Sequence, residues 1–404
     1  MIFHVKATVC VLFCFLYTSC SVLTLNDSAL FNASVTPTTK VLLVVDTSVS
    51  ALLKTEIAIW TSDVAADGIQ VEKIDWSDPS PMALKAVLNT RYTNSSLNGA
   101  FLVGTIASAW YELNSFDQPE RFPTDLFYMD PSANWYDKNS NGDYDSHDPL
   151  AAKIFVSRIT GSVSELKSYF GKDHAYRTGN LSLPKTGWIF KDDSWANYEV
   201  GSTFGLNRLY DTVVIRDAIP QTLRPDYMTQ MESSGSEFVY QWIHATPGNL
   251  YVEDKGTYSL VSTADIASNT FRGMFYNLYD CSAARFTETN LSMTYLTKTP
   301  FGLATLGSTK IGGSYYSLPF FTSLAEGSTW GEAFRSWYNS YGYKDDGWFL
   351  GMVIQGDPTL RVKAAGSKTY SYRVVETGIS PEPDASGVAS LGDSFKQFYK
   401  VLPR

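Results

Sequence analysis

The sequence predicts an α/β protein with a mostly parallel sheet and helices on both of its faces. Short, continuous apolar runs, such as residues 41–45 and 100–103, are typical of strands buried on both sides. These runs alternate with segments whose apolar residues recur at helical spacing, such as Leu84, Val87 and Leu88. Alternation of this kind favours a parallel sheet that is covered by helices.

The predicted elements follow one another along the chain. Pro81 marks the beginning of one helix, and the capping box from Ser162 to Glu165 marks the beginning of another. We expect strands at residues 41–45, 69–76, 100–103, 126–129, 154–156, 188–190, 212–215, 237–244 and 272–281.

The N-terminal region has the layout of a secretory signal. Lys6 precedes an apolar run at residues 9–17, and small residues follow it. The run is shorter than the ~20 apolar residues that a membrane-spanning helix needs. We therefore expect residues 1–22 to be a signal peptide, and the protein to be extracytoplasmic, either secreted or attached to the cell surface. Cys20 lies in a context that loosely resembles a lipoprotein cleavage box, so a lipid anchor there is an alternative to simple secretion.

The remaining chain divides into three segments. Residues 23–39 form a polar leader, and residues 40–364 are long enough for one large α/β domain or for two subdomains divided near residue 185. Residues 365–404 lack periodicity and contain Pro381 and Pro383, which is typical of a linker or C-terminal tail.

Composition narrows the classes of function. Hydrophobic residues make up 44% of the chain and aromatic residues 14%, which is typical of a packed protein and excludes general disorder. The net charge is −9 and no basic residues are clustered, so nucleic acid is not expected as a partner.

One cysteine remains after the predicted signal peptide is removed. Cys281 is then unique in the chain, since the others are Cys10, Cys14 and Cys20. No internal disulfide can form, and an exported free thiol is either buried and inert or retained for its reactivity.

A reactive thiol needs a neighbouring base, and three histidines remain to supply it. His147 lies in an acidic loop and His174 follows a charged segment at the end of a predicted helix, whereas His244 ends a predicted strand. Cys281 ends another strand. Because active sites in open parallel sheets lie at the carboxyl ends of strands, we expect His244 and Cys281 to meet.

Several motifs stand in an order that resembles the gingipain-type cysteine peptidases, which share a caspase-like fold. One strand ends in His244-Ala245, and a later strand ends in Asp-Cys-Ser-Ala-Ala at residues 280–284. The sequence Gly-Asp-Pro-Thr-Leu-Arg at residues 356–361 matches the closing motif of the family. Further family-like stretches lie at residues 156–159, 301–309 and 331–334.

The resemblance implies a mechanism. Cys281 would be the nucleophile, and His244 would help to maintain the thiolate and protonate the leaving amine. The backbone N–H groups of Ala245 and Cys281 would form the oxyanion hole. Alanine replaces the glycine that family members have after the histidine, and alanine lacks the freedom of glycine to adopt positive φ.

Residues 137–148 have the spacing of a calcium-binding loop. Calcium favours six to eight oxygen ligands, and Gly142 occupies the position that needs a sharp turn. The expected ligands are the side chains of Asp137, Asn139, Asn141, Asp145 and Asp148 and the backbone carbonyl of Asp143. The alternative is a solvated turn rich in Asp and Asn. Neither zinc nor an organic cofactor is expected.

Three functions remain open. The leading one is a secreted or surface-attached cysteine endopeptidase that hydrolyses protein or peptide substrates. The second is a catalytically inactive, calcium-stabilised module for binding or surface assembly on the same fold. The third is a glycosidase that uses two carboxylates. No spacing singles out such a pair, because Asp192-Asp193 and Asp345-Asp346 are typical of solvated loops.

Overall fold

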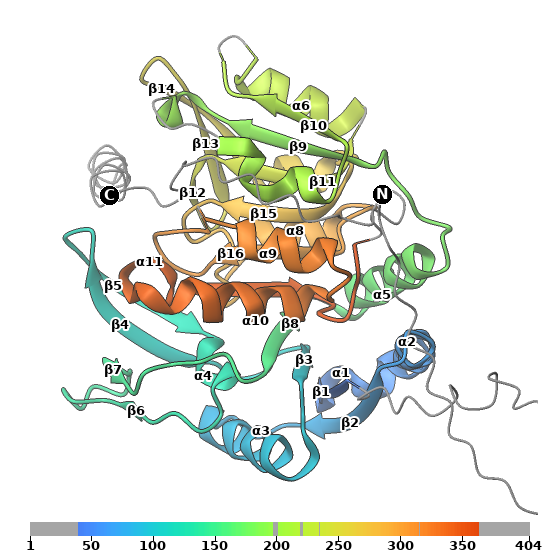
Figure 1. The fold of residues 1–404 in the computed structure, drawn as a ribbon, viewed down its shortest axis with the longest axis vertical. Helices are drawn as coiled ribbons and strands as arrows, with labels where there is room; N and C mark the ends of the chain where they lie inside the picture. Colours follow the sequence, from blue (N-terminus) through green and yellow to red (C-terminus); the bar gives the residue numbers. More distant parts are fainter. Residues whose placement is uncertain (1–38, 197–200, 219–220, 234, 315, 363–404) are drawn as a thin grey trace, which may run out of the picture. The chain divides into compact units, whose positions relative to one another are not determined.

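The computed structural model describes residues 39–362 except 197–200, 219–220, 234 and 315 (Figure 1). Contacts group the described residues into one compact unit. The predicted signal peptide, the Cys20 anchor site, nearly all of the polar leader and the C-terminal tail lie outside the described residues. No helix within the described ranges is both long and apolar enough to cross a bilayer.

The centre of the protein is a sheet of ten strands in the order β10-β9-β11-β15-β16-β17-β8-β3-β1-β2. One half contains β1 (Lys40–Asp46), β2 (Gln70–Trp76), β3 (Gly99–Val103), β8 (Phe155–Ile159) and β17 (Met352–Gly356). The other half contains β9 (Thr186–Lys191), β10 (Thr212–Arg216), β11 (Ser236–Trp242), β15 (Gly273–Tyr279) and β16 (Ala304–Ser308).

Strand direction reverses once, in the middle of this sheet. All strands within each half are parallel, but β16 and β17 pair antiparallel. The carboxyl ends of the two halves therefore point to opposite edges. Apart from β17, strands that precede residue 185 form one half and strands that follow it form the other. The predicted α/β class with a mostly parallel sheet is confirmed.

Helices cover both faces of the sheet. Alternate residues of β1 enter two different cores: Leu42 and Val44 lie in the first, and Val41, Leu43 and Val45 lie in the second. The first core is covered by α3 (Pro81–Ser95), α4 (Leu126–Met129), α9 (Leu318–Ala325) and α10 (Trp330–Ser340). The second core and a third one beside it are covered by α2 (Lys54–Ala66), α5 (Val163–Arg177), α6 (Arg224–Ser233), α7 (Thr263–Ser268) and α8 (Leu291–Lys298).

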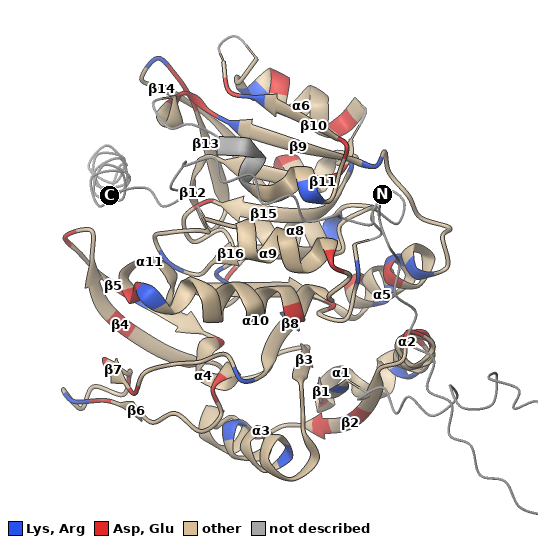
Figure 2. Cartoon of the chain, viewed as in Figure 1, with Lys and Arg blue, Asp and Glu red and all other residues tan. Residues whose placement is uncertain are grey.

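Smaller elements surround the sheet. Three antiparallel groups are β4 (Ala109–Ser115) with β5 (Gln118–Thr124), β6 (Trp135–Tyr136) with β7 (Ser146–His147), and β12 (His244–Thr246) with β13 (Asn249–Asp254) and β14 (Thr257–Ser262). Short helices are α1 (Thr47–Ser50), α11 (Asp346–Phe349), η2 (Ala51–Leu53), η3 (Asp193–Trp195), η4 (Gly201–Arg208) and η5 (Gly342–Lys344). Lys and Arg are mixed with Asp and Glu along the described elements (Figure 2).

Local predictions mostly hold, with two corrections. Helix α5 begins with the predicted capping box of Ser162 and Glu165. Residues 126–129, however, form one turn of helix, in which Met129 N–H donates to the carbonyl of Asp125. The prediction of a strand was wrong because an apolar run this short has no periodicity that distinguishes a strand from a helix. The predicted strand 237–244 is two strands: β11 ends at Trp242, and His244 begins β12 in a separate sheet.

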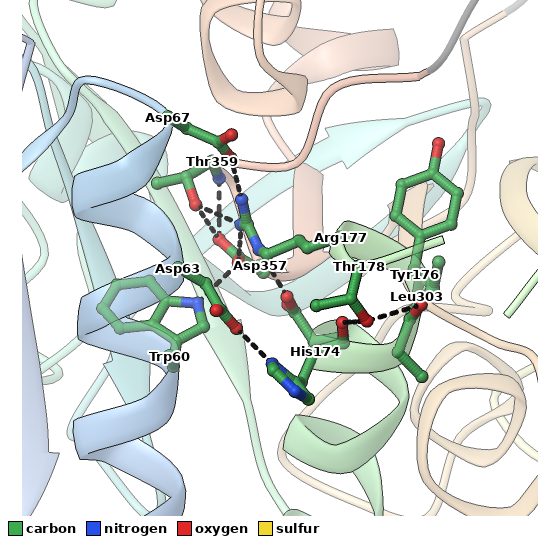
Figure 3. Close-up of polar contacts among 12 residues, drawn as sticks. Trp60, Asp63, Asp67, His174, Tyr176, Arg177, Thr178, Leu303, Asp357 and Thr359 are labelled. Atoms are coloured by element: carbon green, nitrogen blue, oxygen red, sulfur yellow. Dashed lines mark hydrogen bonds and ion pairs between the residues drawn. The ribbon is translucent and has the colours of Figure 1, made fainter. Parts of the chain in front are cut away.

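The family-like closing motif has a structural role (Figure 3). Asp357, directly after β17, is fully buried and accepts hydrogen bonds from Trp60 Nε1 of α2 at 2.6 Å and from Arg177 of α5 at 2.5 Å. Thr359 donates its N–H to the same carboxylate at 2.7 Å, and Arg177 also binds Asp173 at 2.6 Å. The motif therefore anchors the end of β17 to the two helices on one face of the sheet.

Candidate active site

The strands β11 and β15 bring His244 and Cys281 to one edge of the sheet. They are parallel neighbours, and Trp242 pairs with Tyr279 at their carboxyl ends. The rings of this pair lie 4.5 Å apart. His244 and Cys281 each follow two residues later, beyond the ends of these strands. His244 begins β12, and Cys281 lies in a turn in which Ala283 N–H donates to the Asp280 carbonyl. The two strand ends are therefore adjacent, and each predicted residue follows one of them.

An aromatic cluster encloses His244. Its ring lies 4.9 Å from that of Trp195, which comes from η3 after the next strand, β9. Trp195 in turn lies 6.0 Å from Trp242 and 5.3 Å from Tyr279. Three adjacent strands thus contribute to the site. His244 and Cys281 are each only 1% exposed, and burial lowers the pKa of His244 to about 3, so the imidazole is neutral at neutral pH.

Asp280 joins the two strand ends. Its side chain is fully buried, and it accepts the backbone N–H of Ile243 at 3.2 Å and the side-chain amide of Gln241. Gln241 accepts a hydrogen bond from Tyr227 at 2.9 Å, and Tyr227 bonds to Tyr295 at 2.7 Å. This chain of bonds holds the residues before His244 against the residue before Cys281.

Sequence reasoning missed this network, although it left a signal. Gln241 is a polar residue between two aromatic residues near the end of a fully buried strand, and Asp280 directly precedes the cysteine. Burial raises the pKa of Asp280 well above its ordinary value, because an ionised carboxylate is costly in such surroundings.

The chain turns sharply after Cys281. Ser282 has a φ of 57°, in the left-handed region that costs a non-glycine residue about 1–3 kcal/mol. Its N–H donates to the carbonyl of Lys310 at 2.8 Å, and Ala284 N–H donates to Ser308 at 2.9 Å. The residues after the cysteine are therefore fastened to the end of β16, the next strand in the sheet.

Ala245 fits its place without glycine's conformational freedom. It lies in β12 opposite Leu250, its side chain is buried, and it is absent from the residues with positive φ. The alanine that departs from the family motif is thus compatible with the local backbone. The oxyanion hole formed by the N–H groups of Ala245 and Cys281 stays a prediction.

A cavity of about 320 Å³ opens beside the buried pair. The residue after Cys281 and the segment after His244 form part of its wall, and the β4–β5 hairpin forms much of the rest. The lining residues that bear on the chemistry are Ser282, Thr246, Glu120, Arg121, Arg285 and Ile311. Larger hollows of about 490 and 530 Å³ elsewhere on the surface are lined by neither cysteine nor histidine.

The other two histidines have carboxylate partners on other elements. His147 in β7 lies 3.2 Å from Asp346; burial opposes its protonation, but hydrogen bonds to Asp346 and to the Asp148 carbonyl raise its pKa. His174, at the exposed end of α5, lies 2.8 Å from Asp63. His244, unlike these two, follows a strand that is a direct neighbour of the strand before Cys281.

The view of Asp192 as a solvated loop charge is wrong. Its side chain is 1% exposed and accepts the backbone N–H groups of Ser194 at 3.2 Å and Glu253 at 3.0 Å. Asp192 therefore ties η3 to β13, behind Trp195. The loop composition that suggested solvation carries no information on this long-range packing.

The predicted calcium loop forms the tip of the β6–β7 hairpin. Asp137 accepts the N–H groups of Asn141 at 3.1 Å and Gly142 at 2.9 Å. Asp145 closes the loop through one carboxylate oxygen, which accepts the N–H groups of Lys138 and Asn139. Its other oxygen, Oδ1, is buried and accepts no hydrogen bond from the described residues, so it fits a cation.

The remaining predicted ligands divide into two groups. Asp143 directs its carboxylate to Arg121, and the role of its backbone carbonyl as a ligand stays a prediction. Asp148 lies beyond the hairpin, where Asn134 N–H and the Tyr136 hydroxyl donate to it at 3.1 and 3.0 Å.

Glu112 of β4 lies against the loop instead. It accepts hydrogen bonds from the side-chain amides of Asn139 and Asn141, the latter at 2.9 Å. Sequence spacing could not indicate Glu112, because it lies on a different hairpin. Within the described ranges, no group of three or more His, Cys, Asp or Glu side chains is arranged to hold a metal ion, so any site here depends on amide and carbonyl oxygens.

No model of a known protein family matches the chain, and no curated protein matches it. The likeness to gingipain-type peptidases thus rests on the motifs quoted above.

Proposed function

We propose that this protein is an exported cysteine endopeptidase of gingipain type with a caspase-like fold. The observation that supports the proposal is the pairing of Trp242 with Tyr279, which brings together the strand ends that His244 and Cys281 follow two residues later. Asp280 supports it, because the bond to Ile243 N–H holds the two ends together.

The reaction begins from a neutral pair. The buried imidazole of His244 accepts the thiol proton of Cys281, and the thiolate attacks the carbonyl carbon of the peptide. The N–H groups of Ala245 and Cys281 donate to the resulting oxyanion. The C–N bond then breaks, His244 returns the proton to the leaving amine, and water hydrolyses the acyl-enzyme.

A peptide substrate would enter through the cavity beside Ser282. Because Cys281 and His244 are almost fully buried, a peptide reaches them only if a covering segment moves. The β4–β5 hairpin forms one wall of the cavity, and Arg285 donates to its Arg121 carbonyl. Displacement of this hairpin would widen the cavity toward the thiol.

The test is replacement of Cys281 by alanine. We expect hydrolysis of a denatured proteome to fall by about a thousandfold or more, and labelling by a thiol-directed acyl probe to disappear. Ser282→Ala is the matched control, because it changes the neighbouring residue and keeps the thiol. Undiminished hydrolysis in the Cys281→Ala protein would disprove the mechanism.

Burial of the pair also favours a second candidate, an inactive binding or surface-assembly module on the same fold. Its signature is a thiol that resists alkylation in the native protein and reacts only after unfolding. Cleavage of no peptide in the proteome experiment, together with such resistance, would select this alternative. Rapid alkylation of the native protein at neutral pH would reject it.

We further propose that the β6–β7 loop binds calcium in a structural role. The side chains of Asp137, Asn139, Asn141 and Asp145 and the carbonyl of Asp143 would supply oxygen ligands. Glu112 would complete the set from β4 in place of Asp148. The buried, unbonded oxygen of Asp145 is the observation that favours an ion over a plain turn.

A further inference from the structure

Lys310 lies opposite Cys281 at the end of the neighbouring strand. The parallel register of β15 and β16 ends with the pair of Asn277 and Leu306, and Cys281 and Lys310 each follow four residues later. The bond from Ser282 N–H to the Lys310 carbonyl, 2.8 Å, confirms that the two backbones stay adjacent beyond the strands. The Lys310 side chain is 0% exposed.

The surroundings of Lys310 match a charged ammonium. Three acceptors surround Nζ: Glu120 at 3.0 Å, the Gly347 carbonyl at 2.6 Å and the Ile311 carbonyl. An ammonium has three donors, so each finds a partner. The remaining space is apolar, with the Phe116 ring centroid 5.4 Å away, and a charge in such a medium acts strongly on its neighbours.

Electrostatic linkage connects this ammonium to the thiol. Burial lowers the pKa of Lys310, whereas Glu120 and Cys281 both raise it. This interaction is reciprocal. A thiolate at Cys281 stabilises the charged form of Lys310, and the ammonium of Lys310 stabilises the thiolate by the same free energy. His244 cannot supply this charge before reaction, because its buried imidazole is neutral.

We propose that Lys310 stabilises the thiolate of Cys281 through space, and that Glu120 sets how much of the positive charge the thiolate experiences. Lys310 is thus a positioning residue for the nucleophile, and the assignment rests on the proposed function of Cys281. Glu120 belongs to β5 and also accepts Ile311 N–H at 2.8 Å. Movement of the hairpin on substrate entry would carry Glu120 away from Lys310 and strengthen the thiolate when it is needed.

Other charged groups around the pair act differently. Asp280 precedes the cysteine, and burial raises its pKa well above its ordinary value. Asp345, before α11, acts on Lys310 at longer range, and Arg285 lies on the cavity wall and pairs with Glu288 at 3.4 Å. None of these groups forms an ion pair with Lys310 as Glu120 does.

The test titrates the Cys281 thiol by following the ultraviolet absorbance of its thiolate against pH. For each variant, the absorbance of the same variant with the added change Cys281→Ala is subtracted. Lys310→Met should raise the titration midpoint by about one pH unit or more, and Glu120→Gln should lower it. Opposite shifts are the signature of charge, because a merely structural role would move both variants in one direction. Lys167→Met and Glu56→Gln alter an ion pair 3.5 Å apart on α5 and α2, with Lys167 exposed and Glu56 half-buried, and they should leave the midpoint unchanged.

Two outcomes would overturn the proposal: shifts of the same sign, or no shift in folded variants. If Lys310→Met does not fold, Glu120→Gln decides alone, and a midpoint that stays or rises contradicts the proposal. The titration needs no turnover. A protein without peptidase activity can therefore still show the opposite shifts, which separates this inference from the proposed function.

Discussion

Burial controls the chemistry of His244 more than any single charged neighbour does. An imidazole without access to water loses the hydration that stabilises its cation, and the pKa falls from 6.5 to about 3. The same residue in the unfolded chain titrates near its ordinary value. Folding is therefore coupled to proton release from His244 whenever the solution is mildly acidic.

The sign of this coupling gives a prediction. Because the pKa of His244 is lowered by folding, its contribution to stability is present above pH 6.5 and is lost as pH falls toward the folded value. We expect the wild type to lose about 2 kcal/mol of unfolding free energy from this group between pH 6.5 and pH 5. Urea unfolding at both pH values measures it.

His244→Gln is the comparison that isolates the effect. The variant loses packing against Trp195 at every pH, but it has no imidazole to protonate. Its stability should thus change less with acidification than that of the wild type. Asp280, whose raised pKa has the opposite sign, is common to both proteins and cancels. Equal losses in the two proteins would contradict a buried neutral imidazole.

Two hairpins connect the predicted calcium loop to the candidate active site through side-chain contacts. The tip of β6–β7 binds the β4–β5 hairpin through Asp143 and Arg121 and through Asn141 and Glu112. Glu120, which directly precedes Arg121 in β5, forms an ion pair with Lys310 at 3.0 Å. The predicted calcium loop is therefore connected through the β4–β5 hairpin to Lys310, whose carbonyl accepts the N–H of the residue after Cys281.

Calcium should raise the melting temperature of the protein, and a chelator should lower it. Free calcium at a hundred times its dissociation constant stabilises by about 2.7 kcal/mol if only the native state binds it. Replacement of Asp145 by Asn should weaken this response, since it removes the negative charge of the carboxylate whose Oδ1 accepts no hydrogen bond from the described residues.

The structure provides a control within the same loop. Asp143→Asn should keep the calcium response, because the Asp143 carboxylate binds Arg121 and only its backbone carbonyl is a predicted ligand. A melting temperature of the wild type that is indifferent to calcium would identify the loop as an ordinary Asx-rich turn.

The whole sheet depends on its last strand. β17 lies between β16 and β8, pairs with both, and is buried along its full length. It joins two halves whose strands otherwise come from separate parts of the chain. The closing motif then anchors it to α2 and α5 through Asp357 (Figure 3).

Truncation tests this dependence. A chain that ends after Leu350 lacks β17 and leaves the edges of β16 and β8 unpaired, so we expect no cooperative unfolding transition. A chain that ends after Val362 retains every described strand and should unfold cooperatively. Circular dichroism during urea titration compares the two. A cooperative transition in the shorter chain would mean that the two halves fold independently.

Sequence patterns were reliable where burial alone sets the structure. Strands covered on both faces must be apolar throughout, so β1, β3 and β15 were recognisable without any partner. The pattern failed at residues 126–129, where a single apolar turn of helix has the same composition as a short strand. It also failed at His244, whose β12 strand exists only because β13 and β14 pair beside it.

The sequence by itself determined the α/β class, the capping box of α5 and the candidacy of Cys281 and His244, because local periodicity and residue scarcity are readable along one chain. Only the tertiary structure decided the reversal between β16 and β17, the bond from Asp280 to Ile243 and the placement of Lys310 and Glu120 beside the thiol. These features depend on pairing between distant strands and on packing around buried charge. Neither is encoded in the spacing of neighbouring residues.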